Sequence, residues 1–140
     1  MRKDIDEYGT IRYYNEEGRL HREEDPAVEL ADGHKAWYRN GKRHRDDGPA
    51  VEWGDGRKEY WIDDELHRVD GPAVVCADGE KYWFKHDKLH REDGPAIEYA
   101  SGRKSWYVNG KRHREDGPAV EWADGEKEYW INGKRIKKSK

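Results

Sequence analysis

Short runs that mix apolar and polar residues, each four or five residues long, recur along the whole chain at a fixed interval. The heptapeptide His-Arg-x-Asp-Gly-Pro-Ala marks the interval, with small departures in the first copy. A period of this length is typical of arrays in which each unit buries its apolar face only against its neighbours. The histidine of the motif stands at positions 23 residues apart: His21, His44, His67, His90 and His113.

Turn dipeptides separate the apolar runs in every unit and predict β-hairpins. Each pair lies between a run that begins Pro-Ala-Val or Pro-Ala-Ile and a run with adjacent aromatic residues, which is a strong short-range hairpin signal. A second turn signal, Asn-Gly, follows the aromatic run in most copies. The first set of pairs is Asp32-Gly33, Asp55-Gly56, Asp78-Gly79, Ser101-Gly102 and Asp124-Gly125.

Strand alternation then predicts which residues share a face. If Asp55-Gly56 closes a two-residue turn, Val51 faces Tyr60 and Glu52 faces Glu59. The predicted core face carries the columns of Val51, Trp53, Lys58 and Tyr60, and the other face those of Ala50, Glu52, Glu59 and Trp61. The two ladders that abut in this core are Val28/Val51/Val74/Ile97/Val120 and Trp37/Tyr60/Trp83/Trp106/Tyr129.

Proline and the chain ends add detail to this picture. A proline begins a strand in each copy, where its missing N–H is tolerated. The glycine before it in four copies is predicted to supply a backbone conformation that a side chain would hinder. Tyr13-Tyr14 precede a divergent first copy, as a cap does, and Ile136 replaces the sixth histidine. The lysines that follow either protect a terminal strand edge or form a basic binding tail; they are Lys137, Lys138 and Lys140.

The sequence therefore predicts an all-β fold, a single continuous antiparallel array of about five 23-residue β-hairpin repeats forming a twisted ribbon of about eleven short strands. We expect one repeat domain over residues 1–140. Its parts are an N-terminal partial repeat or cap at 1–20, repeats at 21–43, 44–66, 67–89, 90–112 and 113–135, and a basic tail at 136–140.

Composition argues against disorder and against a strong global field. Hydrophobic residues make up 33% of the chain and charged residues 42%, which is lean for a compact core. The seven Trp and nine Tyr residues, however, are periodic, and disordered segments lack such residues. A formal net charge of −3 steers the chain toward neither nucleic acid nor an anionic membrane.

The single cysteine and the lack of long apolar runs bear on the compartment. Cys76 excludes an internal disulfide and fits a reducing environment. It shares a column with Leu30, Trp53, Tyr99 and Trp122, so we predict a buried apolar filler, with a reactive thiol as the alternative. No run reaches membrane-spanning length, and Met1-Arg2-Lys3-Asp4 begins no signal peptide. We expect a soluble, cytoplasmic protein with no membrane partner.

The segments Trp130-Ile131-Asn132-Gly133-Lys134-Arg135 and Tyr107-Val108-Asn109-Gly110-Lys111-Arg112-His113 resemble the aromatic-x-Asn-Gly-Lys-x-His core of MORN (membrane occupation and recognition nexus) repeats. The resemblance covers the whole chain and implies stacked hairpins that act as an interaction scaffold. It departs where MORN units carry Tyr-x-Gly-x-Trp, because the glycine place here holds Ala36, Glu59, Tyr82, Ser105 and Glu128.

The whole unit is more similar to the His-Arg-Glu-Asp-Gly-Pro-Ala repeats of uncharacterised phage and large DNA virus proteins. This resemblance implies a fold and a viral source, with host cytoplasm as the location. It implies almost nothing about activity.

The repeated histidines and arginines invite chemical interpretations. Equivalent residues in successive hairpins lie roughly 9.6 Å apart, too far for one zinc ion with bonds of about 2.0–2.1 Å. We predict that each histidine packs or hydrogen-bonds in its turn, with a partner-facing row as the alternative. No metal, cofactor or catalytic residue is predicted. Catalysis requires one asymmetric pocket that holds a nucleophile or base against a substrate, and no Ser, Thr or Cys repeats alongside these groups. The arginines either pair with acidic neighbours or form an anion-binding ladder of Arg45, Arg68, Arg91 and Arg114.

Interleaved arginine and aromatic residues could also stack on nucleic acid, but glutamate rows and the negative net charge disfavour it. The middle copy replaces Asn-Gly-Lys by Asp63-Asp64-Glu65, through drift or as an acidic partner-specific patch. We therefore predict a non-enzymatic protein-binding module, which the viral resemblance narrows to an inhibitor of a host or defence protein. The alternative is a sponge for a small anionic, nucleotide-like ligand, and the ribbon could pair with a second copy. The predicted partner-binding residues are Trp61, Asp63, Asp64, Glu65, Phe84, Tyr107 and Trp130.

Overall fold

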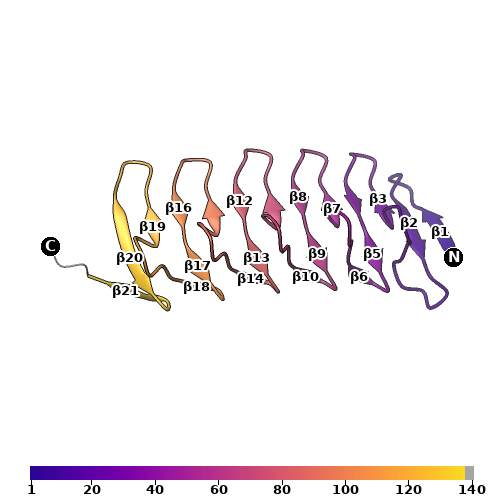
Figure 1. The fold of residues 1–140 in the computed structure, drawn as a ribbon. Helices are drawn as coiled ribbons and strands as arrows, with labels where there is room; N and C mark the ends of the chain where they lie inside the picture. Colours follow the sequence, from indigo (N-terminus) through magenta and orange to yellow (C-terminus); the bar gives the residue numbers. More distant parts are fainter. Residues whose placement is uncertain (138–140) are drawn as a thin grey trace. The chain divides into compact units, whose positions relative to one another are not determined.

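The computed structural model describes residues 1–137, which form strands and turns and no helix (Figure 1). The predicted all-β class and the antiparallel hairpin repeats are therefore confirmed. No helix among these residues is long and apolar enough to cross a lipid bilayer. The chain forms two compact units, Met1–His67 and Arg68–Lys140, which divide next to the predicted start of the repeat at 67. Lys138 and Lys140 of the predicted basic tail lie outside the described residues.

The first unit contains one antiparallel sheet in the order β1-β2-β3-β4-β7-β8 and two separate two-stranded hairpins, β5-β6 and β9-β10. Consecutive strands of the sheet are neighbours, so the chain advances by one hairpin at a time. The strands are β1 (Arg2–Ile5), β2 (Ile11–Tyr14), β3 (Val28–Glu29), β4 (Lys35–Ala36), β5 (Tyr38–Arg39), β6 (Lys42–Arg43), β7 (Val51–Glu52), β8 (Lys58–Glu59), β9 (Trp61–Ile62) and β10 (Glu65–Leu66).

The second unit repeats this plan, with the sheet order β11-β12-β15-β16-β19-β20-β21 and the hairpins β13-β14 and β17-β18. The strands are β11 (Val74–Val75), β12 (Lys81–Tyr82), β13 (Phe84–Lys85), β14 (Lys88–Leu89), β15 (Ile97–Glu98), β16 (Lys104–Ser105), β17 (Tyr107–Val108), β18 (Lys111–Arg112), β19 (Val120–Glu121), β20 (Lys127–Ile131) and β21 (Lys134–Ile136).

The described residues form more strands than the eleven predicted, because most long strands change partner at an aromatic residue. The N–H of Trp37 donates to the carbonyl of Ala50 in the next repeat at 2.6 Å, whereas its own carbonyl accepts from the N–H of His44 at 3.0 Å. Trp83 and Trp106 do the same. Each repeat therefore contributes to the sheet on one side of this residue and to a separate hairpin on the other.

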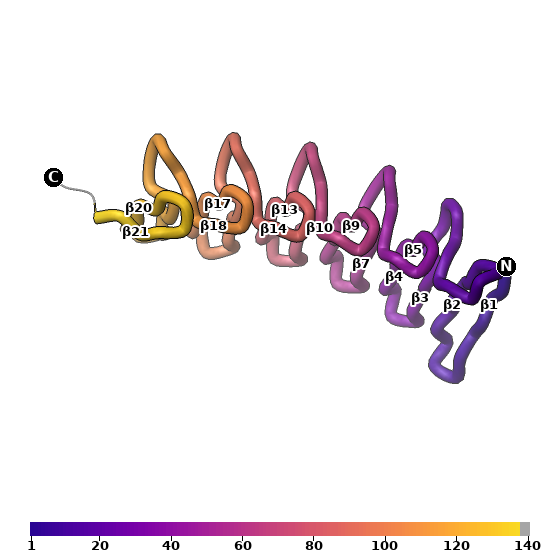
Figure 2. Tube along the Cα trace, turned by 90° about the horizontal axis from the view of Figure 1, so that it is seen from below, coloured from indigo at the N-terminus to yellow at the C-terminus, as the bar shows by residue number. Residues whose placement is uncertain are grey.

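The separate hairpins have two-residue turns in which both central residues adopt positive φ, as type I′ turns require. Asn40 and Gly41 have φ of 49° and 81°. The divergent middle copies keep the same conformation with Asp63-Asp64 and His86-Asp87. Figure 2 shows these hairpins as tight curls that recur within each unit.

The predicted register of the sheet hairpins is wrong by one residue. Val51 pairs with Glu59, not Tyr60, and Glu52 pairs with Lys58. The N–H of Trp53 donates to the carbonyl of Arg57 at 2.8 Å, so the loop contains three residues. Its last residue, Gly56, has a φ of 100°, as a three-residue loop with a left-handed closing residue requires.

The corrected register changes the composition of the core. Across the strands, each residue of the valine column now pairs with a residue at the position that holds glycine in MORN repeats. We call this row of alternating residues the inner row. In the second unit it runs Ile97, Ser105, Val120 and Glu128. Tyr60 of the predicted core is only half-buried. The buried apolar residues are small except for Trp37: Ala27, Ala36, Ala50, Val51, Ala73, Val74, Ala96, Ile97, Ala119 and Val120.

The glycines before proline are needed for space, which corrects the prediction of a special backbone conformation. Gly48, Gly71, Gly94 and Gly117 are not among the residues with positive φ. A Cβ atom at Gly94 would lie 2.8 Å from Cζ of Arg91, and the other three positions show the same approach. The arginine of each motif occupies the volume that a side chain here would fill.

A matched pair of valines in the second unit tests the thin core. Val120 is fully buried and Val69 is 89% exposed. Because Val120→Ala removes buried methyl groups and leaves a cavity, we expect it to lower the free energy of unfolding by about 2 kcal/mol. Val69→Ala should change it by less than about 0.5 kcal/mol. Urea unfolding followed by tryptophan fluorescence measures both, and equal effects would contradict this core.

Candidate functional site

Each repeat contains a link, defined as the six residues from the motif histidine to the proline, and its arginine lies beneath an acidic surface. In the link 44–49, the guanidinium of Arg45 stacks 3.9 Å from the ring centre of Trp37. Its Nη1 donates to the carbonyl of Pro49 at 3.1 Å. Asp47 at 3.2 Å and Glu52 at 3.3 Å neutralise the cation. Stacking and charge-assisted hydrogen bonds thus fix the side chain.

The other links repeat this arrangement. Arg91 stacks on Trp83 at 3.9 Å and pairs with Asp93 and Glu98, and Arg114 stacks on Trp106 at 4.1 Å. Arg68 pairs with Asp70 at 3.2 Å and donates to the carbonyl of Pro72. Each of the four predicted anion-binding arginines, Arg45, Arg68, Arg91 and Arg114, therefore already carries a carboxylate partner.

The motif histidines join consecutive repeats. Nδ1 of His44 accepts from the backbone N–H of Asp63, 3.0 Å away in the next type I′ turn, and Nε2 lies 2.8 Å from Asp46. His113 accepts from the N–H of Asn132 at the same distance. Acceptance at Nδ1 assigns the proton of the neutral ring to Nε2. The prediction placed these hydrogen bonds within the histidine's own turn, whereas Nδ1 of His44 and of His113 bonds to the hairpin turn of the next repeat.

The acidic residues of the links point outward. In the links 44–49, 90–95 and 113–118 their side chains are 75–91% exposed, whereas the link arginines are 23–27% exposed. A pocket of about 400 Å³ lies between the first two links of the first unit, with Trp37 in its lining. A pocket of about 640 Å³ lies between the links that carry Arg91 and Arg114, lined by Trp106. Carboxylates form much of the rim of both pockets.

In two of the repeats, a glutamate of the inner row accepts hydrogen bonds from two tryptophans, an arrangement that we call the glutamate clamp. Glu59 is only 7% exposed and accepts from the indole N–H groups of Trp53 and Trp61 at 3.0 and 2.9 Å. Glu128 does the same with Trp122 and Trp130 at 3.3 and 3.0 Å. The hydrogen bond from Trp130 is the main cause that holds the pKa of Glu128 below its usual value. Sequence reasoning missed these glutamates because the predicted register placed them outside.

The predicted acidic patch lies on one hairpin of the first unit, and its aspartates bond to the preceding repeat. Asp64 accepts from the backbone N–H and from Nε of Arg43 at 2.9 and 3.0 Å. Although burial raises the pKa of Asp64, these bonds hold it below the usual value. Asp63 lies 3.3 Å from Nδ1 of His44, and Glu65 pairs with Ile62 across the hairpin. The guanidinium of Arg43 covers Trp61 at 3.7 Å.

The remaining predicted partner-binding residues, Phe84, Tyr107 and Trp130, occupy the same position in successive repeats of the second unit, on β13, β17 and β20. All three are half-buried. The guanidinium of Arg112 lies 5.8 Å from the ring centre of Tyr107 and 5.0 Å from that of Trp130. Sequence reasoning did not identify this arginine as part of the aromatic column. A signal for it was available, since Arg43 holds the equivalent position.

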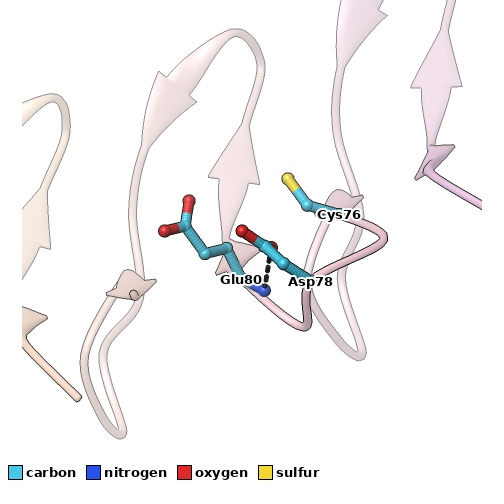
Figure 3. A group of neighbouring side chains, drawn as sticks. All are labelled: Cys76, Asp78 and Glu80. Carbon is cyan, nitrogen blue, oxygen red and sulfur yellow. Dashed lines mark hydrogen bonds between the residues drawn. The ribbon is translucent and has the colours of Figure 1, made fainter. Parts of the chain in front are cut away.

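One other cluster brings together potential metal ligands. Cys76, Asp78 and Glu80 have ligand atoms within 4.8 Å of one another (Figure 3). Asp78 accepts from the N–H of Glu80 at 3.0 Å, as Figure 3 shows. Glu80 accepts from the hydroxyl of Tyr82 at 3.0 Å and from the N–H of Ala100 at 3.2 Å. These carboxylates thus stabilise the loop, and Cys76 is half-buried where the sequence predicted a buried filler.

No protein-family model matches the chain, and no curated protein matches its sequence. A functional conclusion therefore has to rest on the residues described above.

The clamp of Glu128 predicts a pH-dependent contribution to stability. Because the folded-state pKa lies below its usual value, the carboxylate stabilises the fold above about pH 4.5 and loses this effect as the pH falls. We expect Glu128→Gln to lower the urea midpoint at pH 7, since an amide cannot accept from both indoles through equivalent oxygens. At pH 3 the difference should shrink. The exposed Glu126→Gln is the control, and an unchanged difference at the two pH values would contradict the clamp.

Tyr82 predicts a loss of stability at alkaline pH. Burial and the hydrogen bond to Glu80 raise its pKa to about 12. The unfolded chain therefore ionises first, and the stabilisation is lost as the pH rises from about 10 towards 12. We expect Tyr82→Phe to be less stable than the parent at pH 7, and this gap should be clearly narrower at pH 11. The measurement is the urea midpoint, with the exposed Tyr8→Phe as control; a constant gap would be the contrary result.

Proposed function

We propose that the chain is a non-enzymatic protein-binding repeat module whose links contact a cationic protein surface. The separation of charge in the links carries this proposal. The cations lie beneath the surface, stacked on aromatic rings and bonded to carbonyl groups, whereas the carboxylates of the same motif extend into solvent. Positive and negative residues alternate in the sequence of the link, but in the fold its arginine is covered and its exposed residues are negative.

The regular spacing of the links supports a macromolecular partner. Within each unit, equivalent carboxylates recur once per repeat on a hydrogen-bonded framework, so little conformational freedom is lost when they meet lysine or arginine side chains. Complementary charge accelerates encounter and excludes partners of the wrong sign.

The same geometry disfavours the alternative, a sponge for an anionic nucleotide-like ligand. Such a ligand would have to pass the exposed carboxylates of the links and displace those already bonded to the arginines. Both imidazole nitrogens of His44 are likewise engaged, Nδ1 by the backbone of the next repeat and Nε2 by Asp46 of its own link, which argues against a general base and for a non-enzymatic role. The narrower proposal, a viral inhibitor of a host or defence protein, rests on the resemblance of the repeat motif alone.

A charge-reversal experiment tests the link surface. Glu92 and Glu115 are suitable, because their side chains are 83% and 84% exposed and lie 3.7 and 3.5 Å from the link histidines. The carboxylates of Asp93 and Asp116, which pair with the stacked arginines, stay in place. We expect Glu92→Lys/Glu115→Lys to weaken binding to a partner captured from nuclease-treated extract at least tenfold, mainly through slower association. Surface plasmon resonance with the identified partner measures the change.

The control places a single charge reversal on an exposed loop, in Glu126→Lys, and is compared with each link substitution made singly. This variant should bind as the parent does. Equal binding by the link variant, or a thermal shift with millimolar ATP that the link variant shares, would contradict the proposal and favour the sponge.

A further inference from the structure

The pocket between the first two links of the first unit contains one of the chain's own arginines. Arg39 lies on β5 and forms part of the lining of this pocket of about 400 Å³. Its Nη1 lies 3.7 Å from Asp46 of the second link, and its Nη2 lies 3.6 Å from Asp63 in the following hairpin turn. Nη2 also lies 3.5 Å from Nδ1 of His44. In this unit a guanidinium is thus held between two links, beside a link carboxylate.

The pocket between the links 90–95 and 113–118 of the second unit is built from the same positions. Nine of its ten lining residues are the equivalents, three repeats later, of residues that line the first pocket. The position of Arg39, however, holds Val108. The volume is about 640 Å³ instead of about 400 Å³, as expected where a short side chain replaces a long one. The lining of the second pocket has two arginines and four carboxylates, one cation fewer than that of the first.

The two arginines that line the second pocket do not take the place of Arg39. Arg91 and Arg114 are stacked on tryptophan rings and paired with carboxylates of their own links. Glu92 and Glu115, in contrast, extend into solvent at the rim of the pocket. The second pocket therefore presents exposed carboxylates to a cation from outside the chain.

The contacts that hold Arg39 are kept in part in the second unit. Glu115 is the equivalent of Asp46, so the link carboxylate is present in both pockets. Asn132 stands in the place of Asp63, and the second contact of Arg39 thus has a neutral equivalent. The common feature of the two pockets is the pair of acidic links on either side.

We infer that the pocket of the second unit binds an arginine side chain of the partner protein. This inference rests on the proposed function and names the residue that the partner inserts between the links. The guanidinium takes the position that Arg39 takes in the first unit and pairs with Glu115, while its alkyl stem contacts Val108. In the first unit Arg39 fills the equivalent pocket, so a partner arginine is excluded there.

Geometry favours a guanidinium over an ammonium and a protein over a free ligand. The planar guanidinium has five N–H donors and can bond to carboxylates of both links at once, whereas an ammonium acts as a point charge. The acidic surface also continues to Asp70 of the preceding link in the same unit, which is 87% exposed. Equivalent link residues lie roughly 9.6 Å apart, so a protein can contact several links whereas one guanidinium cannot.

The test uses the full chain and N-acetylarginine amide, which presents an arginine side chain between two amide groups. Two-dimensional NMR should show saturable shifts of the indole N–H of Trp106 and of the methyl groups of Val108, because both residues line the pocket. N-acetylcitrulline amide, the neutral analogue of similar shape, should bind at least tenfold more weakly.

Exchange of the two pocket residues gives the matched variants. Val108→Arg supplies a guanidinium as Arg39 does in the first unit, so it should remove the shifts at Trp106. Ala123→Arg adds the same charge to an exposed loop of the same unit and should leave the shifts unchanged. Arg39→Val should create a second binding site, which the indole N–H of Trp37 detects.

Equal binding of the citrulline analogue, or shifts at Trp106 that persist in Val108→Arg, would overturn the inference. The partner captured in the link experiment should bind Val108→Arg at least tenfold more weakly than the parent and Ala123→Arg normally. A partner that is lost by Glu92→Lys/Glu115→Lys but retained by Val108→Arg would refute the arginine pocket and leave the proposed link surface standing. A partner that both variants retain would refute the proposed function, and the assignment of the pocket with it.

Discussion

The stacking of Arg45, Arg91 and Arg114 on tryptophan rings is the interaction on which the rest of the structure depends. The buried apolar residues are mostly alanine and valine, so little hydrophobic area is available per repeat. The guanidinium of Arg45 adds stabilising contacts where the buried apolar area is small. It contacts Trp37, the carbonyl of Pro49 and the carboxylate of Glu52. It also explains the glycine before proline, whose missing side chain leaves room for the arginine. One cation thus connects a strand, a turn and the following strand.

The sequence was sufficient for the period, the hairpins and the type of fold, because turn dipeptides and aromatic pairs recur in every copy. It was not sufficient for the register. An Asp-Gly pair suits a two-residue turn and also the end of a three-residue loop, and only the position of Gly56 in the folded backbone distinguishes them. That single residue decides whether Glu59 points outward or inward. The sequence also did not show that the link carboxylates are exposed, because a run of alternating charges does not reveal which sign is covered.

Divergent repeats show how substitutions are compensated by immediate neighbours. Asp64 occupies a left-handed position where three other copies have glycine, and its carboxylate is bonded to Arg43. In the fourth copy Ser105 replaces the glutamate of the inner row. Its hydroxyl and Nε of Arg103 are then buried without a hydrogen-bond partner, whereas Nε of Arg57 lies 3.0 Å from Glu59 in the second copy. Arg103 instead stacks on Trp122 at 3.9 Å. The arginine at this position can thus form an ion pair in one copy and stack on a ring in another, so the sequences of the copies can diverge while the fold is kept.

The proposed link surface depends on the number of repeats. Each link adds carboxylates of the same kind, so the attraction of a cationic partner grows with the number of links that it can span. The arginine of each link is held by hydrogen bonds beneath these carboxylates, as Arg45, Arg91 and Arg114 are held by the carbonyl groups of the prolines that end their links. Substitution of an exposed carboxylate therefore changes the attraction for a partner while it leaves this buried framework in place.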